Sequence, residues 1–127
     1  MILLSRFMKQ DGKHEDAPTV HSLRFHQTLS YIHQHLTEAI TVKSLADRCY
    51  MHPDAYSRLF LQKMGRRPLD YIHEQRMERA KLLLSTTSHS IKEISHLIGY
   101  ENPTYFHRVF RRALTCSPVD YRKSVSK

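Results

Sequence analysis

Apolar side chains recur at helical spacing in two segments of the chain, 53–64 and 103–114. They fall three and four positions apart, which places them on one face of an α-helix and leaves polar residues on the other. Each segment begins with a proline, a residue that suits the first turn of a helix. The pattern therefore predicts two amphipathic helices with buried inner faces. The inner positions are Tyr56, Leu59, Phe60 and Met64 in one helix, and Phe106, Val109, Phe110 and Leu114 in the other.

These segments belong to a duplicated unit. The four prolines beyond residue 38 stand at positions 53, 68, 103 and 118, with spacings of 15, 35 and 15. A shift of fifty residues pairs Arg58 with Arg108, Phe60 with Phe110, and the tetrapeptide 68–71 with the one at 118–121. Upstream of the first proline in each copy the best shift is 49, so the second copy has one extra turn residue.

A shorter helix is predicted before each amphipathic helix. Thr41 can cap a helix that runs to about residue 49, and Ser90 with Glu93 forms a capping-box pattern. Gly99 suits the left-handed conformation at the end of the second of these helices. Both turns span about four residues, which is the spacing of a helix-turn-helix motif.

Three further helices complete the prediction: residues 20–36, residues 68–84, and a terminal helix that opens at Pro118. No segment shows the alternation typical of a strand. The helix at 68–84 has no breaker and keeps an apolar stripe made of Leu69, Ile72, Met77, Ala80, Leu83 and Leu84. The predicted fold is all-α, with seven helices: a helix-turn-helix lobe at 20–67, a long linker helix at 68–84, a second helix-turn-helix lobe at 85–127, and a flexible tail or linker remnant at 1–19.

The charge of the chain points to a polyanionic partner. The 127 residues include 20 Lys and Arg against 12 Asp and Glu, a formal charge of +8. Up to residue 38 the charges balance, and residues 39–127 hold 16 cations against 8 anions. The excess therefore coincides with the duplicated segment, and duplex DNA is the expected partner.

Other function classes are disfavoured by what the composition lacks. Three glycines are too few for a phosphate-cradling loop, and no dinucleotide or P-loop motif occurs. Cys49 and Cys116 lie 67 positions apart without a nearby partner, which favours a reducing, cytoplasmic setting over a disulfide scaffold. No apolar run approaches the ~20 residues of a membrane span. We expect no membrane association and no cofactor.

The outer faces of the two amphipathic helices are the candidate base-reading surfaces. An α-helix fits the major groove, where an arginine can bond guanine O6 and N7 for about 1–3 kcal/mol of discrimination. The same face is presented twice with an arginine at the matching position, although each arginine could instead pair with a carboxylate of a neighbouring helix. The candidate base contacts are Asp54, Ser57 and Arg58 in the first helix, and Thr104, His107 and Arg108 in the second.

Further cations near the helix ends are candidates for phosphate contacts, since backbone N–H groups and cations there can hold phosphates together. Any single one of them is an ordinary solvated charge; the set as a whole carries the argument. The candidate phosphate contacts are Lys63, Arg66, Arg67, Lys92, Arg111 and Arg112.

Three other functions are alternatives to sequence-specific DNA binding. The ten histidines raise metal chemistry, but His26 and His33 stand ~10.5 Å apart along a helix, too far to share a zinc ion directly. We therefore expect neither an enzyme nor a metal site. A non-specific architectural nucleic-acid-binding protein would also be basic and helical, but it would not need two matched reading faces. A protein–protein adaptor would show no duplex affinity.

The combined motifs resemble the DNA-binding domain of AraC/XylS-family transcription regulators over residues 22–123. The matching positions are Leu45-Ala46, Arg58-Leu59-Phe60, Gly65, Pro68, Tyr71-Ile72, Arg76, Ala80, Leu82-Leu83-Leu84, Ile91, Glu93-Ile94, Gly99-Tyr100, Tyr105-Phe106, Arg108-Val109-Phe110, Pro118 and Tyr121-Arg122. The resemblance implies a sequence-specific regulator, usually an activator that recruits RNA polymerase. Its two recognition helices would enter adjacent major grooves about one helical turn apart. It also implies base contacts at the six positions given above.

The chain departs from the family pattern at several places. Tyr50 occupies a turn position where the family commonly has a small residue, and Ser95 replaces an alanine. Arg67 precedes Pro68 in place of a capping Ser or Thr, and Thr115 replaces a glycine. The effector or dimerisation domain that most members carry is not among these 127 residues, so a small stand-alone member and a piece of a longer regulator are both open.

Overall fold

The structure of the protein, a computed structural model, describes residues 20–126. Over that range the chain forms seven α-helices and no strand, which confirms the predicted all-α fold. The helices are α1 (Val20–Gln34), α2 (Val42–Arg48), α3 (Pro53–Met64), α4 (Pro68–Thr86), α5 (Ile91–Leu97), α6 (Pro103–Leu114) and α7 (Pro118–Val125).

The helix starts follow the local chemistry of the sequence. Ahead of α2, Thr41 Oγ1 accepts the N–H of Ser44 at 3.0 Å, and Ser44 Oγ accepts the N–H of Thr41 at 3.4 Å. Ahead of α5, Ser90 Oγ accepts the N–H of Glu93 at 3.0 Å, and Glu93 Oε1 accepts the N–H of Ser90 at 2.8 Å. Both boxes satisfy backbone donors that the first turn of a helix cannot pair internally. The backbone bond to Glu93 also lowers the pKa of that carboxyl group.

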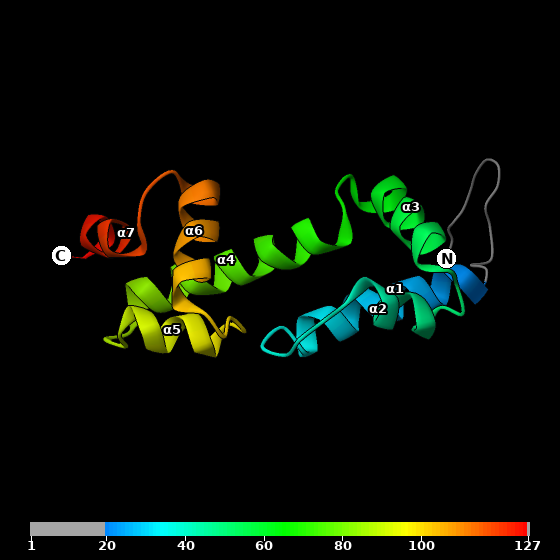
Figure 1. Cartoon of the computed structure of the whole chain (residues 1–127), viewed down its shortest axis with the longest axis horizontal. Helices are drawn as coiled ribbons and strands as arrows, with labels where there is room; N and C mark the ends of the chain where they lie inside the picture. Colours follow the sequence, from blue (N-terminus) through cyan, green and yellow to red (C-terminus); the bar gives the residue numbers. More distant parts are fainter. Residues whose placement is uncertain (1–19, 127) are drawn as a thin grey trace, which may run out of the picture.

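Two separate hydrophobic cores divide the molecule into two lobes (Figure 1). In the first lobe α1, α2 and α3 pack together, and in the second lobe α5, α6 and α7 pack together. The long helix α4 runs between them and belongs to both cores. Its Ile72 is buried in the first core, and Met77, Ala80 and Leu84 are buried in the second.

Aromatic packing repeats with the same period as the sequence. The ring centroids of Tyr56 and Phe60 lie 5.9 Å apart, and those of Phe106 and Phe110 lie 5.8 Å apart. The next ring along also matches, with 5.5 Å between Phe60 and Tyr71 and 5.8 Å between Phe110 and Tyr121. The side chains of Tyr56, Phe60, Phe106 and Phe110 are fully buried. The inner faces predicted for α3 and α6 therefore form the centre of each core.

One position of the predicted apolar stripe on α4 is wrong. Leu69 lies in the first turn of α4, belongs to neither hydrophobic core, and is 48% exposed. Arg76, by contrast, is 8% exposed although it carries a charge. The stripe that packs against the two lobes thus begins at Pro68, omits Leu69, and includes a buried arginine.

Candidate nucleic-acid interface

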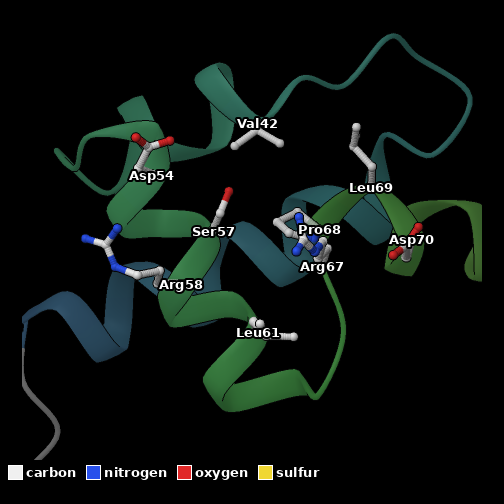
Figure 2. A pocket seen from close by; sticks show the side chains of 9 residues that line it. All are labelled: Val42, Asp54, Ser57, Arg58, Leu61, Arg67, Pro68, Leu69 and Asp70. Carbon is white, nitrogen blue, oxygen red and sulfur yellow. The ribbon is translucent and has the colours of Figure 1, made fainter.

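The outer face of α3 carries Asp54, Ser57 and Arg58, here called the first reading face. Asp54 and Arg58 are exposed and Ser57 is half-buried. Figure 2 shows the three side chains projecting from α3 beside a hollow of about 480 Å³. The hollow is also lined by Arg67 and Leu69, from the segment that enters α4. The structure thus brings a base-reading candidate, Arg58, and a phosphate candidate, Arg67, to the rim of one hollow.

The outer face of α6 carries Thr104, His107 and Arg108, here called the second reading face, and all three are exposed. The polar face is opposite the buried Phe106 and Phe110, as the helical period requires. The guanidinium carbon of Arg108 lies 5.9 Å from the centroid of the exposed Tyr105 ring. Tyr105 therefore adds an aromatic surface beside the second reading face, which sequence reasoning missed.

Each reading helix is held at its N-terminus by a side-chain cap. His52 Nδ1 accepts the N–H of Asp54 at 3.2 Å, and Asn102 Oδ1 accepts the N–H of Thr104 at 2.8 Å. Such caps satisfy donors of the first turn and fix the direction in which the helix leaves the preceding turn. The residues that begin each reading face are therefore held at a well-defined helix start.

The turn of the second motif is one residue longer than the turn of the first, as the sequence predicted. Four residues separate α2 from α3, and five separate α5 from α6. Both turns contain a left-handed residue, Tyr50 with φ 54° and Gly99 with φ 101°. A tyrosine in that conformation is strained, since its Cβ crowds the backbone. The Tyr50 ring is 77% exposed and is covered on one face by Arg24, whose guanidinium carbon lies 4.3 Å from the ring centroid.

The other departures from the family pattern are accommodated locally. Arg67 makes no side-chain cap at the start of α4, as predicted. Thr115 adopts φ 63° at the end of α6, the conformation that Gly65 adopts at the end of α3 with φ 77°. Ser95 is fully buried, and its hydroxyl donates to the carbonyl of Lys92 at 2.8 Å. None of the four changes alters the helix order.

The two reading-face arginines are available for an external partner. Within residues 20–126, neither Arg58 nor Arg108 lies within 4.0 Å of a carboxylate. The alternative in which each arginine pairs with a neighbouring helix therefore has no support in the described part of the chain. An exposed guanidinium group without a carboxylate partner can donate its N–H groups to a planar acceptor such as the edge of a base.

The candidate phosphate contacts gather at helix ends, and all six are exposed. Lys63, Arg66 and Arg67 follow the reading face of α3, and Arg111 and Arg112 lie in the last turn of α6. Arg66 differs from the others because its guanidinium is paired with Glu74 on α4. The remaining member, Lys92, lies in the first turn of α5.

Residues 20–126 contain neither a candidate cluster of metal ligands nor a candidate membrane-spanning helix. No group of three or more His, Cys, Asp or Glu side chains within 20–126 could hold a metal ion. No helix in this range is both long enough and apolar enough to cross a membrane. Cys49 is buried, and burial raises the pKa of its thiol, so it is a poor nucleophile.

The comparisons with known proteins agree with this geometry. A family model described as a helix-turn-helix domain matches residues 45–124. The HTH-type transcriptional regulator YisR of Bacillus subtilis is 38% identical over 97 residues, which cover 76% of this chain and 34% of that protein. The arabinose operon regulatory protein of Escherichia coli is 34% identical over 100 residues, covering 78% of this chain and 34% of that protein. The chain thus spans about a third of the length of these curated relatives.

Among solved structures, the DNA-binding domain of the global transcriptional factor AdpA, crystallised in complex with a target DNA, is similar to this chain. The two share 32% sequence identity with a TM-score of 0.76, and the match covers 80% of this chain and 91% of the AdpA domain. Fold, family model and relatives therefore agree. The chain belongs to the AraC/XylS family of transcription regulators and forms a DNA-binding domain of that family with two helix-turn-helix motifs.

Proposed function

We propose that the chain binds duplex DNA sequence-specifically by placing α3 and α6 in successive major grooves, and that it activates transcription by positioning RNA polymerase. The observation that carries the proposal is the matched pair Arg58 and Arg108. Each is exposed, each lies on the outer face of the second helix of its motif, and neither has a carboxylate partner within the described residues. Two such faces on one chain suit a site with two blocks about one helical turn apart.

The proposed contacts follow from the chemistry of each reading face. Arg58 and Arg108 donate to guanine O6 and N7, and Asp54 accepts from a cytosine amino group. Ser57, Thr104 and His107 offer hydroxyl and imidazole groups that bond to bases of either type. The candidate phosphate cations, with Arg66 the weakest because it is paired with Glu74, fix the register without reading sequence.

The test is selection from a random duplex library with residues 1–127. We expect an asymmetric consensus of two blocks whose centres lie about 34 Å apart, with a guanine facing each arginine. A consensus with one block would contradict the use of both helices. Retention of a selected site at ~0.15 M salt against excess random duplex should show a preference of at least ~10³. An absence of preference would identify a non-specific architectural protein instead.

The activator role needs a separate measurement. Transcription in vitro from a promoter that carries the selected site upstream should rise when the chain is added with RNA polymerase. A fall in transcript would show that the chain represses by occupying the promoter.

A further inference from the structure

The two lobes touch each other directly beside the linker helix. The contact lies between Gly99, in the turn of the second motif, and the carbonyl oxygen of Leu36, in the segment that follows α1. A Cβ added at Gly99 would stand 2.8 Å from that oxygen, closer than real Cβ atoms approach any neighbour. Gly99 also has a φ of 101°, which favours glycine for a second reason. The close approach of the lobes therefore depends on the absence of a side chain at this position.

Arg76 of α4 fills the space beside this contact. Its Nε donates to the carbonyl of Leu36 at 2.9 Å, and its Nη2 donates to the carbonyl of Glu38 at 2.8 Å. The guanidinium carbon also lies 5.1 Å from the centroid of the Tyr100 ring, in the second lobe. One side chain on the linker thus contacts the chain after α1 and the turn before α6.

The buried charge of Arg76 favours one orientation of the first lobe relative to the linker helix. Arg76 is 8% exposed, and within residues 20–126 it has no carboxylate within 4.0 Å. A buried cation is costly unless acceptors satisfy it, and here the acceptors are two backbone carbonyls of the first lobe. Rotation of the first lobe about the linker would remove both acceptors at once. The orientation seen in the structure is therefore favoured over neighbouring ones.

A second set of contacts passes from the same place to α6. His73, one turn before Arg76 on α4, has its Nδ1 2.6 Å from the hydroxyl of Tyr100. The two rings are stacked with an interplanar angle of 6° and a centroid distance of 5.8 Å. The Tyr105 ring, in the first turn of α6, meets Tyr100 at 5.8 Å and His73 at 6.1 Å. The contacts of Arg76 with Tyr100 thus continue to the helix that carries the second reading face.

We infer that these contacts form an interlobe joint, and that Arg76 is a positioning residue that holds the two reading faces at one separation and angle. The joint consists of Leu36, Glu38, His73, Arg76, Gly99 and Tyr100. Since the inference rests on the proposed function, its consequence for DNA is a selection of spacing. A chain with an intact joint distinguishes sites by the distance between their two blocks as well as by the sequence of each block.

The first test measures the joint without DNA. Spin labels on Gln62→Cys in α3 and Ala113→Cys in α6, in a Cys116→Ser background, report the distance between the reading helices; both positions are exposed. We expect a single narrow distance distribution in the parent chain. Arg76→Gln removes the guanidinium group that donates to both backbone carbonyls. Gly99→Ala adds a Cβ that crowds the carbonyl oxygen of Leu36 and forces the lobes apart. Both variants should broaden or shift the distribution, whereas Arg79→Gln, an exposed change on the same helix, should leave it unchanged.

The second test measures spacing selection. Duplexes carry the selected blocks at their best spacing, or with one base pair added or removed, and isolated blocks serve as controls. The parent chain should lose at least about tenfold in affinity for the altered spacings, the equivalent of one lost base contact. In Arg76→Gln and Gly99→Ala that penalty should fall below about threefold, while affinity for each isolated block is retained. Arg76→Lys keeps the positive charge but loses the planar guanidinium that bonds two carbonyls at once, so it should show an intermediate spacing penalty.

The outcomes separate the two proposals. If both joint variants fold, keep a narrow label distance and keep the full spacing penalty, the interlobe joint is overturned while sequence-specific binding stands. If the parent chain shows no site preference, the proposed function fails, and the label distances alone decide whether the joint exists. If one variant fails to fold, the other perturbs the same contact from a different element, α4 for Arg76→Gln or the turn of the second motif for Gly99→Ala, and decides the matter.

Discussion

Thr28 of α1 and Tyr56 of α3 meet hydroxyl to hydroxyl inside the first lobe, with 2.9 Å between Thr28 Oγ1 and Tyr56 Oη. Both side chains are fully buried. The Thr28 hydroxyl donates to the carbonyl of Phe25 at 2.6 Å, so it is left to accept from Tyr56. Burial raises the pKa of Tyr56 to about 12, which keeps the phenol protonated and able to donate. This bond ties the back of the first reading helix to α1.

Removal of the Tyr56 hydroxyl should therefore cost stability without disturbing the reading face. Tyr56→Phe deletes one buried hydrogen bond, and we expect the free energy of unfolding to fall by ~1 kcal/mol. Urea unfolding followed by circular dichroism measures the change. Tyr121→Phe, at a half-buried ring with no hydroxyl bond among the described contacts, is the matched control and should change stability less. Equal losses in the two variants would show that packing, not the hydrogen bond, is being measured.

The duplicated cores give a second pair of matched substitutions. Phe60→Ala and Phe110→Ala each remove a fully buried ring at the same position of the repeat. We expect each to destabilise the chain by ~3–5 kcal/mol through lost burial and the cavity left behind. Amide hydrogen exchange should show the loss of protection centred on α3 for Phe60→Ala and on α6 for Phe110→Ala. A variant that melts like the parent would show that its lobe does not depend on that core.

Much of this architecture can be predicted from the sequence because it is local. Proline at the first helical position and the capping box at Ser90 act within one or two helical turns, and so does the spacing that places Tyr56 and Phe60 on one face of α3. Each of these features is present in the structure. The exposure of Leu69 could not be predicted in this way, since helical period alone does not tell where a core ends.

The interlobe contacts could not be predicted for a different reason. Arg76 bonds to carbonyls 40 and 38 positions earlier in the chain, and a backbone carbonyl has no sequence signature. The exposed Tyr105 was also missed, because its position in the helical period lies between the predicted inner face and the predicted outer face of α6. By contrast, the solvent exposure of the outer faces of α3 and α6 could be predicted, since these faces are what remains once the buried face of each helix is known; their contacts with bases stay a prediction.

The reading-face arginines should carry sequence preference. Arg58→Ala and Arg108→Ala should each weaken binding to the selected site by about 1–3 kcal/mol and relax preference in one block while leaving the other block unchanged. Fluorescence anisotropy against duplexes substituted block by block measures both effects. Arg79→Ala, an exposed arginine on α4, removes the same charge elsewhere and should leave preference unaltered. Relaxation of both blocks by one substitution would assign that arginine a structural role.

Two neighbouring arginines should differ in their effect on salt dependence. Arg67 is exposed at the hollow beside the first reading face, whereas Arg66 is paired with Glu74. Loss of one phosphate contact reduces the slope of log affinity against log salt by about one. Arg67→Ala should show that reduction, and Arg66→Ala should show a smaller one, because its partner carboxylate already neutralises part of its charge. The reverse order would mean that the ion pair opens on binding.

The interlobe joint should weaken in mild acid because of His73. Burial lowers the pKa of His73 in the folded chain, and the nearby charge of Arg76 lowers it further, with Arg112 acting in the same direction and Asp70 opposing. The unfolded chain then binds more protons than the folded one, so stability rises with pH and is lost as pH falls through the ordinary histidine pKa of about 6.5. Protonation would also prevent Nδ1 from accepting the hydroxyl of Tyr100, which lies 2.6 Å away.

Unfolding free energies measured between about pH 7.5 and pH 5.5 test this directly. The chain has ten histidines, so the informative quantity is the difference between the parent and His73→Gln, which removes this titration alone. The parent should lose more stability than the variant over that range, and the distance between labels on α3 and α6 should broaden in the parent at the acidic end. His89→Gln, at an exposed histidine next to Glu93, is the control and should not flatten the pH dependence in this way. Parallel curves for the parent and His73→Gln would exclude His73 as the acid-sensitive group of the joint.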